Sequence, residues 1–90
     1  MDLGLKGKVA LVAAASKGLG FGVARALATD GAKVSICSRD TASVEAAAKK
    51  LSDETGSEIL ANVCDVTNAD SINAWVDATV AKWGAIDALL

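Results

Sequence analysis

The sequence contains no tyrosine, no histidine and no proline, and aromatic residues make up only 3% of it. Tyrosine and histidine are among the side chains that most often move a proton in catalysis, and no paired carboxylates replace them in this chain. We therefore expect no catalytic residue within these 90 residues. We also expect no metal site.

Strong charge, long apolar runs and frequent cysteines are missing as well. The net charge of −2 gives no basic surface of the kind that binds nucleic acid or an anionic membrane. No apolar run approaches the roughly 18 residues that span a bilayer, and the first residues lack the layout of a signal peptide. The only cysteines, Cys37 and Cys64, are too far apart in sequence for a CxxC motif. These features predict a cytoplasmic protein with reduced thiols that binds neither nucleic acid nor membrane.

Small aliphatic residues are what the chain has in abundance. Apolar residues make up 52% of the sequence although aromatic ones are few, so Ala, Val, Leu and Ile supply the difference. Aliphatic strands covered by alanine-rich helices are typical of α/β proteins. A length of 90 residues allows one small domain.

Apolar runs and helical periodicities alternate along the chain. Short β-rich runs predict strands over 9–13, 33–38, 58–64 and 86–90. Between them, three helical patterns are expected: one over 19–30, one capped by Asp40 or Thr41 and ended by Gly56, and one capped by Thr67 or Asn68 and ended by Gly84. Strands alternating with helices at this spacing predict an α/β fold with a doubly wound parallel sheet, present here as its first βαβαβαβ portion.

A polar or glycine-rich segment stands at the carboxyl end of each of the first three predicted strands. The first covers 14–20, the second is Ser38 with Arg39, and the third is Asp65 with Val66. In doubly wound sheets ligands bind beyond the carboxyl ends of the strands, which all lie at one edge. Gly18 also opens a predicted helix, and the backbone N–H groups at such a helix start bind phosphate. A nucleotide is therefore the expected ligand.

The residues after the second predicted strand indicate which nucleotide. An NAD site usually has an acidic side chain there, which accepts hydrogen bonds from the ribose 2′-hydroxyl and repels a 2′-phosphate. Ser38 stands at this position and Arg39 follows it. A guanidinium binds phosphate in a bidentate manner, and Lys17 offers a second cation. The pattern favours NADP(H) over NAD(H), the alternative being a surface Arg39 paired with Asp40.

Three segments carry a family resemblance: VALVAAASKGLG, the SRD after the second strand and the CDVTN after the third. They resemble the nucleotide-binding, amino-terminal half of the short-chain dehydrogenases/reductases, and are most similar to the 3-oxoacyl-acyl-carrier-protein reductases. Gly18 and Gly20 match two glycines of the family motif Thr-Gly-x-x-x-Gly-x-Gly, while Ala13 and Ala14 replace its Thr and first Gly. The resemblance implies a Rossmann-type fold in which Lys17 contacts the 2′-phosphate. The predicted cofactor-binding residues are Ala14, Ser16, Lys17, Gly18, Leu19, Gly20, Ser38, Arg39, Asp65 and Val66.

Asp65 has two interpretations. By resemblance its carboxylate accepts a hydrogen bond from the adenine amino group, while the backbone N–H of Val66 meets the ring. The alternative is a helix N-cap or a turn residue, which are common places for aspartate.

The resemblance also implies what the rest of the protein does. The family reduces carbonyl groups with a Tyr, a Lys four residues later, a Ser and an Asn, all beyond the fourth strand. We therefore expect 1–90 to be the nucleotide-binding half of a domain that is cut within its fourth strand. By itself it would be inactive. The complete protein would be a homo-oligomeric NADP(H)-dependent oxidoreductase that acts on a carbonyl or alcohol substrate. The alternative is a non-catalytic nucleotide-binding or interaction module.

Several further residues have a predicted place in the interior. Cys37 and Cys64 are expected to be small buried apolar residues, and Gly22 to permit close packing of its helix on a strand. Ile72, Val76, Val80 and Trp83 lie along the predicted apolar stripe of the third helix, with Trp75 packing on that helix too.

Overall fold

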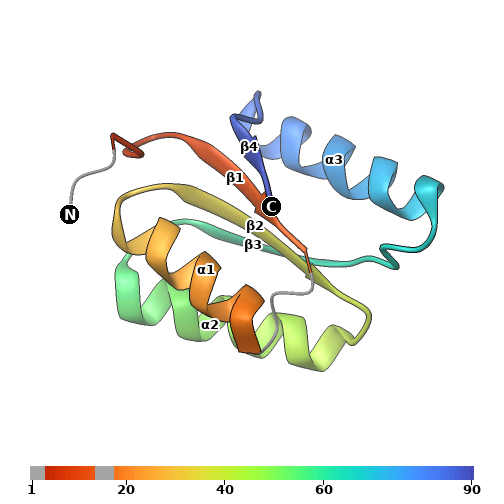
Figure 1. Ribbon diagram of the computed structural model, residues 1–90, viewed down its shortest axis with the longest axis horizontal. Coiled ribbons are helices and arrows are strands. Elements are labelled where there is room, and N and C mark those ends of the chain that lie inside the picture. The colour runs from red at the N-terminus through yellow and green to blue at the C-terminus, as the bar shows by residue number, and fades with distance from the viewer. Residues whose placement is uncertain (1–3, 14–17) are drawn as a thin grey trace.

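A computed structural model describes residues 4–13 and 18–90 of the chain (Figure 1). Strands and helices alternate in the predicted order. They are β1 (Val9–Val12), α1 (Gly18–Thr29), β2 (Lys33–Ser38), α2 (Thr41–Thr55), β3 (Ile59–Val63), α3 (Ala69–Trp83) and β4 (Ala88–Leu89). Some strand ends lie one or two residues inside the predicted limits, but every predicted element is present in its place.

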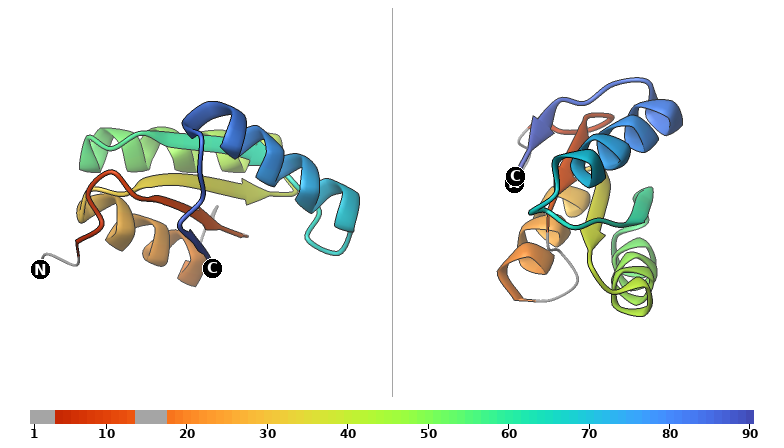
Figure 2. Two further views of the ribbon diagram at one scale, coloured as in Figure 1. Left: turned by 90° about the horizontal axis from the view of Figure 1, so that it is seen from above. Right: turned by 90° about the vertical axis from the view of Figure 1, so that its right-hand side faces the viewer.

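The four strands form one parallel sheet in the order β3-β2-β1-β4. The chain moves from β1 to β3 through α1 and α2, and these two helices cover one face of the sheet (Figures 1 and 2). It then returns through α3, on the opposite face, to place β4 beside β1. Helices on both faces of a parallel sheet confirm the predicted doubly wound α/β fold.

Side chains and glycines set the helix ends as the sequence predicted, and the structure chooses between the alternatives. Asp40 is the N-cap of α2, where its side chain accepts a hydrogen bond from the backbone N–H of Ala42. Asn68 is the N-cap of α3 and accepts from the N–H of Ser71. Both helices end at left-handed glycines, Gly56 and Gly84, whose φ angles are 73° and 83°.

Apolar side chains between the sheet and helices α1 and α2 are buried from solvent. Val34 and Ile36 of β2 and Leu51 of α2 have no exposed surface, and Val44 of α2 is 1% exposed. Full burial of each such side chain contributes roughly 1.5–3 kcal/mol. The buried residues of α2 are Val44, Ala47, Ala48 and Leu51, which share one face of the helix at the spacing i, i+3, i+4 and i+7.

The α3 face has a second, smaller cluster built from Leu11, Cys37, Cys64 and Trp75. Both cysteines are buried, as predicted, and neither is in a disulfide. Trp75 and Trp83 pack on this face, also as predicted.

The predicted stripe of α3 is wrong at Val80, which is 41% exposed. Thr79 is fully buried instead, and its hydroxyl lies 2.8 Å from that of Ser35 on β2. The same Ser35 oxygen accepts the indole N–H of Trp75 at 2.9 Å. This buried polar network turns Trp75 and Thr79 toward the sheet and leaves Val80 at the helix surface.

The prediction for Gly22 is also wrong. A Cβ atom added at this position would meet no atom within 4 Å, and the residue is exposed on α1. Close contact between α1 and the sheet is made by Ala24 and Ala28 instead, which are 0% and 1% exposed. Gly22 has no packing reason in this structure.

Candidate functional site

The carboxyl ends of β1, β2 and β3 lie at one edge of the sheet, because all three strands run parallel (Figure 1). The three predicted site segments follow these ends. Of the predicted residues, Ala14, Ser16 and Lys17 lie outside the residues that the structure describes. The other seven are placed by it, and they come from α1, the end of β2 and the loop after β3.

Helix α1, which follows β1, begins at Gly18, where no other atoms crowd the backbone. Gly18 has a φ of 67°, a conformation that side chains rarely adopt, and a Cβ atom there would meet nothing within 4 Å. The side chain of Leu19 is 86% exposed and Gly20 is partly buried. The first N–H groups of a helix have no partner within it, so this helix start can accept an anion.

The end of β2 forms a tight turn that turns Arg39 outward. The hydroxyl of Ser38 donates to the carbonyl oxygen of Asp40 at 3.2 Å and accepts the Asp40 N–H at 3.3 Å. Ser38 itself is 9% exposed, whereas the Arg39 side chain is 74% exposed. The serine therefore closes the turn with an uncharged group, and the arginine offers its guanidinium to the outside.

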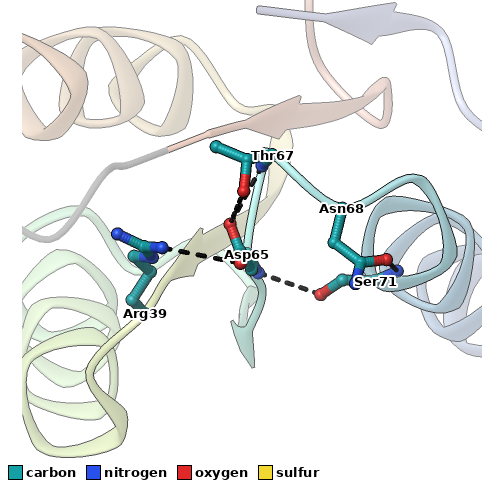
Figure 3. A network of polar contacts seen from close by, with 5 residues as sticks. All are labelled: Arg39, Asp65, Thr67, Asn68 and Ser71. Carbon is teal, nitrogen blue, oxygen red and sulfur yellow. Dashed lines mark hydrogen bonds and ion pairs between the residues drawn. The ribbon is translucent and has the colours of Figure 1, made fainter.

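The loop after β3 lies directly against this turn. The backbone N–H of Cys64 donates to the carbonyl oxygen of Ser38 at 2.9 Å, which extends the pairing of β2 and β3 by one step. Asp65 follows, and its Oδ2 lies 3.5 Å from a guanidinium nitrogen of Arg39 (Figure 3). Arg39 thus forms an ion pair with Asp65, and the carboxylate of Asp40 caps α2, where it accepts from Ala42 and Ser43.

Asp65 is held in a turn of its own. Its Oδ1 accepts the N–H of Thr67 at 2.9 Å and the hydroxyl of the same residue at 2.7 Å. Its backbone N–H donates to the hydroxyl of Ser71 at 2.9 Å, so the loop is fastened to the first turn of α3 (Figure 3). The turn interpretation of Asp65 is confirmed and the helix-cap interpretation is wrong, because Asn68 is the cap. Oδ2 takes no part in this turn and faces the Arg39 guanidinium.

These contacts also act on the charge of Asp65. The hydroxyl of Thr67, then its backbone N–H, lower the pKa of the Asp65 carboxyl below its ordinary value. Desolvation opposes them, and the charge of Arg39 lowers the pKa by a smaller amount. The group is therefore ionised at neutral pH.

Three features of this edge were not expected from the sequence: the Arg39–Asp65 ion pair and the contacts of the Thr67 and Ser71 hydroxyls with Asp65. Adjacent parallel strands bring the residues after their carboxyl ends together, so the order of β2 and β3 in the sheet was the signal for the pair. Val66, which was expected, is 45% exposed beside Asp65.

Other kinds of site are not found in the described part of the chain. Among residues 4–13 and 18–90, no group of three His, Cys, Asp or Glu side chains lies close enough together to hold a metal ion. None of the described helices is long and apolar enough to cross a bilayer.

Comparison with known proteins defines the family. A model of the short chain dehydrogenase family matches residues 8–90, so the chain belongs to that family. It is 37% identical to 3-oxoacyl-[acyl-carrier-protein] reductase FabG of Chlamydia muridarum, over 96% of this chain and 35% of that protein.

Solved structures agree with the fold. L-sorbose reductase from Gluconobacter frateurii, complexed with NADPH and L-sorbose, superposes with a TM-score of 0.95 at 30% identity, over 99% of this chain and 34% of that one. An NAD+-bound xylitol dehydrogenase superposes with a TM-score of 0.88 at 33% identity, over 94% and 32%. The chain thus spans about a third of the length of each of these relatives.

Proposed function

We propose that the chain is the NADP(H)-binding part of a short-chain dehydrogenase/reductase that transfers hydride between NADP(H) and a carbonyl or alcohol substrate. One observation carries the preference for NADP(H). A neutral Ser38 and a 74% exposed Arg39 stand after β2, where an NAD-specific site has an acid. The fold alone does not select the cofactor, since similar structures bind NADPH in one case and NAD+ in another.

Each part of the cofactor has a proposed partner. The first N–H groups of α1, at Gly18, Leu19 and Gly20, bind the pyrophosphate together with the preceding segment, where Ala14, Ser16 and Lys17 are expected to contribute. Arg39 and Lys17 bind the 2′-phosphate, with Ser38 leaving room for it. Asp65 and Val66 bind the adenine. When bound, the nicotinamide ring of the cofactor gives or accepts the hydride.

The residues present fit such a group. The backbone around Gly18 is open, and no acid occupies the helix start of α1. The Ser38 hydroxyl is engaged in its own turn, so this position presents neither negative charge nor a bulky side chain to a 2′-phosphate. The Asp65 carboxylate is ionised and fixed by Thr67, which leaves Oδ2 as an acceptor suited to an amino group.

The proton-transfer groups of the reaction are proposed to lie outside these residues. The family's Tyr and its partner Lys have no counterpart here, because the sequence contains no tyrosine. We therefore expect residues 1–90, as the nucleotide-binding half of a domain, to bind the cofactor without turning over a substrate. The similarity to FabG supports a 3-oxoacyl thioester as the substrate class.

Two further parts of the proposal come from composition and family. A cytoplasmic location is proposed because the chain has only two cysteines, which are not in a CxxC spacing. A homo-oligomer follows from the resemblance, and sedimentation of the complete protein measures it.

Titration of the complete protein with NADP(H) and NAD(H) tests the cofactor proposal. Arg39→Ala should raise the Kd for NADP(H) by about 10- to 100-fold, because a charge-assisted hydrogen bond contributes about 1.5–3 kcal/mol. The Kd for NAD(H) should stay within about two-fold. Equal affinities of the wild type for both cofactors would contradict the proposal.

The matched control is Lys33→Ala. Lys33 stands at the other end of β2 and pairs with Glu58, the residue before β3, again at 3.5 Å. Its removal deletes a comparable ion pair between the same segments of chain, at the edge where no cofactor is expected.

Cofactor binding without turnover of any carbonyl substrate by the complete protein would favour the non-catalytic module.

A further inference from the structure

The Arg39–Asp65 ion pair joins two residues to which the proposed function gives different parts of the ligand. Arg39 is assigned to the 2′-phosphate, which only NADP(H) has. Asp65 is assigned to the adenine, which both cofactors share. With Asp65 Oδ2 3.5 Å from the Arg39 guanidinium, the two roles are not independent, since residues in contact do not contribute additively.

Asp65 is the fixed member of the pair. Its Oδ1 takes two hydrogen bonds from Thr67, and its backbone N–H is tied to Ser71. Its side chain is 41% exposed, against 74% for that of Arg39. Figure 3 shows Asp65 tied on both sides, to Thr67 and to Ser71, whereas the exposed Arg39 side chain is the member of the pair that is free to move.

Two anions therefore compete for the Arg39 guanidinium: the Asp65 carboxylate and the 2′-phosphate of NADP(H). A 2′-phosphate carries about two negative charges at neutral pH and draws Arg39 from Asp65 Oδ2. A 2′-hydroxyl carries none, so the ion pair persists when the ribose is unphosphorylated. The pair stabilises the state with Arg39 on Asp65, and binding of the phosphate has to break or share it.

We propose that Asp65 is a specificity-determining residue that limits the preference for NADP(H) by holding the Arg39 guanidinium. This inference rests on the proposed function, namely a dinucleotide bound at this edge with its 2′-phosphate at Arg39. Asp65 then has two separable effects: it strengthens binding of both cofactors through the adenine, and it lowers the ratio of the NAD(H) to the NADP(H) dissociation constant through Arg39.

A double-mutant cycle on the complete protein separates the two effects. Asp65→Asn, Arg39→Ala and the double variant are titrated with NADP+ and with NAD+ in low salt. Asn keeps an acceptor for Thr67 and removes the charge. We expect Asp65→Asn to weaken both cofactors but to raise the NAD+/NADP+ ratio of Kd values about two- to five-fold, the size of an exposed ion pair. In the Arg39→Ala background the same substitution should leave the ratio unchanged.

Three controls accompany the double-mutant cycle. Asp65→Ala removes the same charge without an amide and should raise the ratio likewise. Glu58→Gln breaks the Lys33 pair at the opposite edge and should leave the ratio unchanged. Raising the ionic strength should shrink the effect of Asp65→Asn, because salt screens exposed charges.

The outcomes distinguish this inference from the proposed function. A wild type that binds both cofactors equally, or neither, overturns the proposed function and the inference with it. A wild-type preference for NADP+ that Asp65→Asn leaves unchanged or lowers overturns the inference alone. So does an equal rise of the ratio with and without Arg39.

Discussion

The interior of the sheet and its carboxyl edge are held together in opposite ways. In the interior, Leu11, Ile36 and Leu51 have no exposed surface and are fixed by apolar contact on all sides. At the edge, the side chain of Arg39 is 74% exposed and that of Leu19 is 86% exposed. Fixed geometry there comes from hydrogen bonds within short turns, such as the bonds from Thr67 to Asp65.

This difference separates stability from binding. Removing atoms from the interior leaves cavities and lowers the free energy of unfolding, whereas truncating an exposed side chain at the edge changes that free energy little. The edge residues are therefore free to be chosen for a ligand. Substitutions in the two regions should accordingly change different measured quantities, which three pairs of variants test.

The largest effect is expected from Leu51→Ala in the interior. Leu51 is fully buried in the cluster between α2 and the sheet, so the substitution leaves a cavity and should lower the free energy of unfolding by about 2–5 kcal/mol. Urea denaturation of the complete protein measures it. The matched control is Leu19→Ala at the edge, expected to change stability by less than about 0.5 kcal/mol. Similar losses for both leucines would break the comparison.

A smaller loss is expected from Ser35→Ala, which tests the polar part of the interior. The Ser35 oxygen lies 2.8 Å from the Thr79 hydroxyl and accepts from the Trp75 indole at 2.9 Å and from the Asn62 amide at 3.1 Å. Its removal leaves the buried indole N–H of Trp75 without its acceptor, while Thr79 keeps its bond to the Trp75 carbonyl oxygen. The substitution should lower the free energy of unfolding by about 1–3 kcal/mol.

The control for Ser35 is Ser43→Ala, which removes an exposed hydroxyl bonded to Asp40 at 2.7 Å. Its cost should stay below about 1 kcal/mol, because water replaces the lost partner. The ratio of Kd values for the two cofactors should change in neither variant. A Ser35→Ala variant as stable as the wild type would show that the network is dispensable.

The smallest effects come from two glycines of the same helix. Gly22→Ala should stabilise the protein by about 0.5–1 kcal/mol, because the new methyl meets no atom within 4 Å and alanine favours the helix. Gly18→Ala should destabilise it by about 1–2 kcal/mol, because the φ of 67° strains a side chain. Thermal unfolding measures both.

The same two variants also separate edge from interior in binding. Gly18→Ala should weaken NADP(H) and NAD(H) alike, since the pyrophosphate is common to them, while Gly22→Ala should leave both Kd values unchanged. A loss of binding with Gly22→Ala would mean that the site extends further along α1 than the proposal holds.

Local sequence determined most of the fold. The alternation of short apolar runs with helical periods predicted all seven elements, and β2 was predicted at its observed limits, Lys33–Ser38. Asp40, Asn68, Gly56 and Gly84 act as predicted because capping is decided within a few residues of chain. The parallel sheet followed as well, and with it the edge at which the site residues gather.

The features that the sequence did not predict depend on contacts between residues far apart in the chain. A helical period says which residues share a face, but Ser35, more than 40 positions away, decided that Thr79 is buried and Val80 exposed. Likewise Arg39 had charged neighbours in sequence, and its ion pair with Asp65 exists because β2 and β3 are adjacent. Pairing over such distances depends on which strands meet and in what register. No local pattern encodes that, because it is set by the burial of the whole sheet.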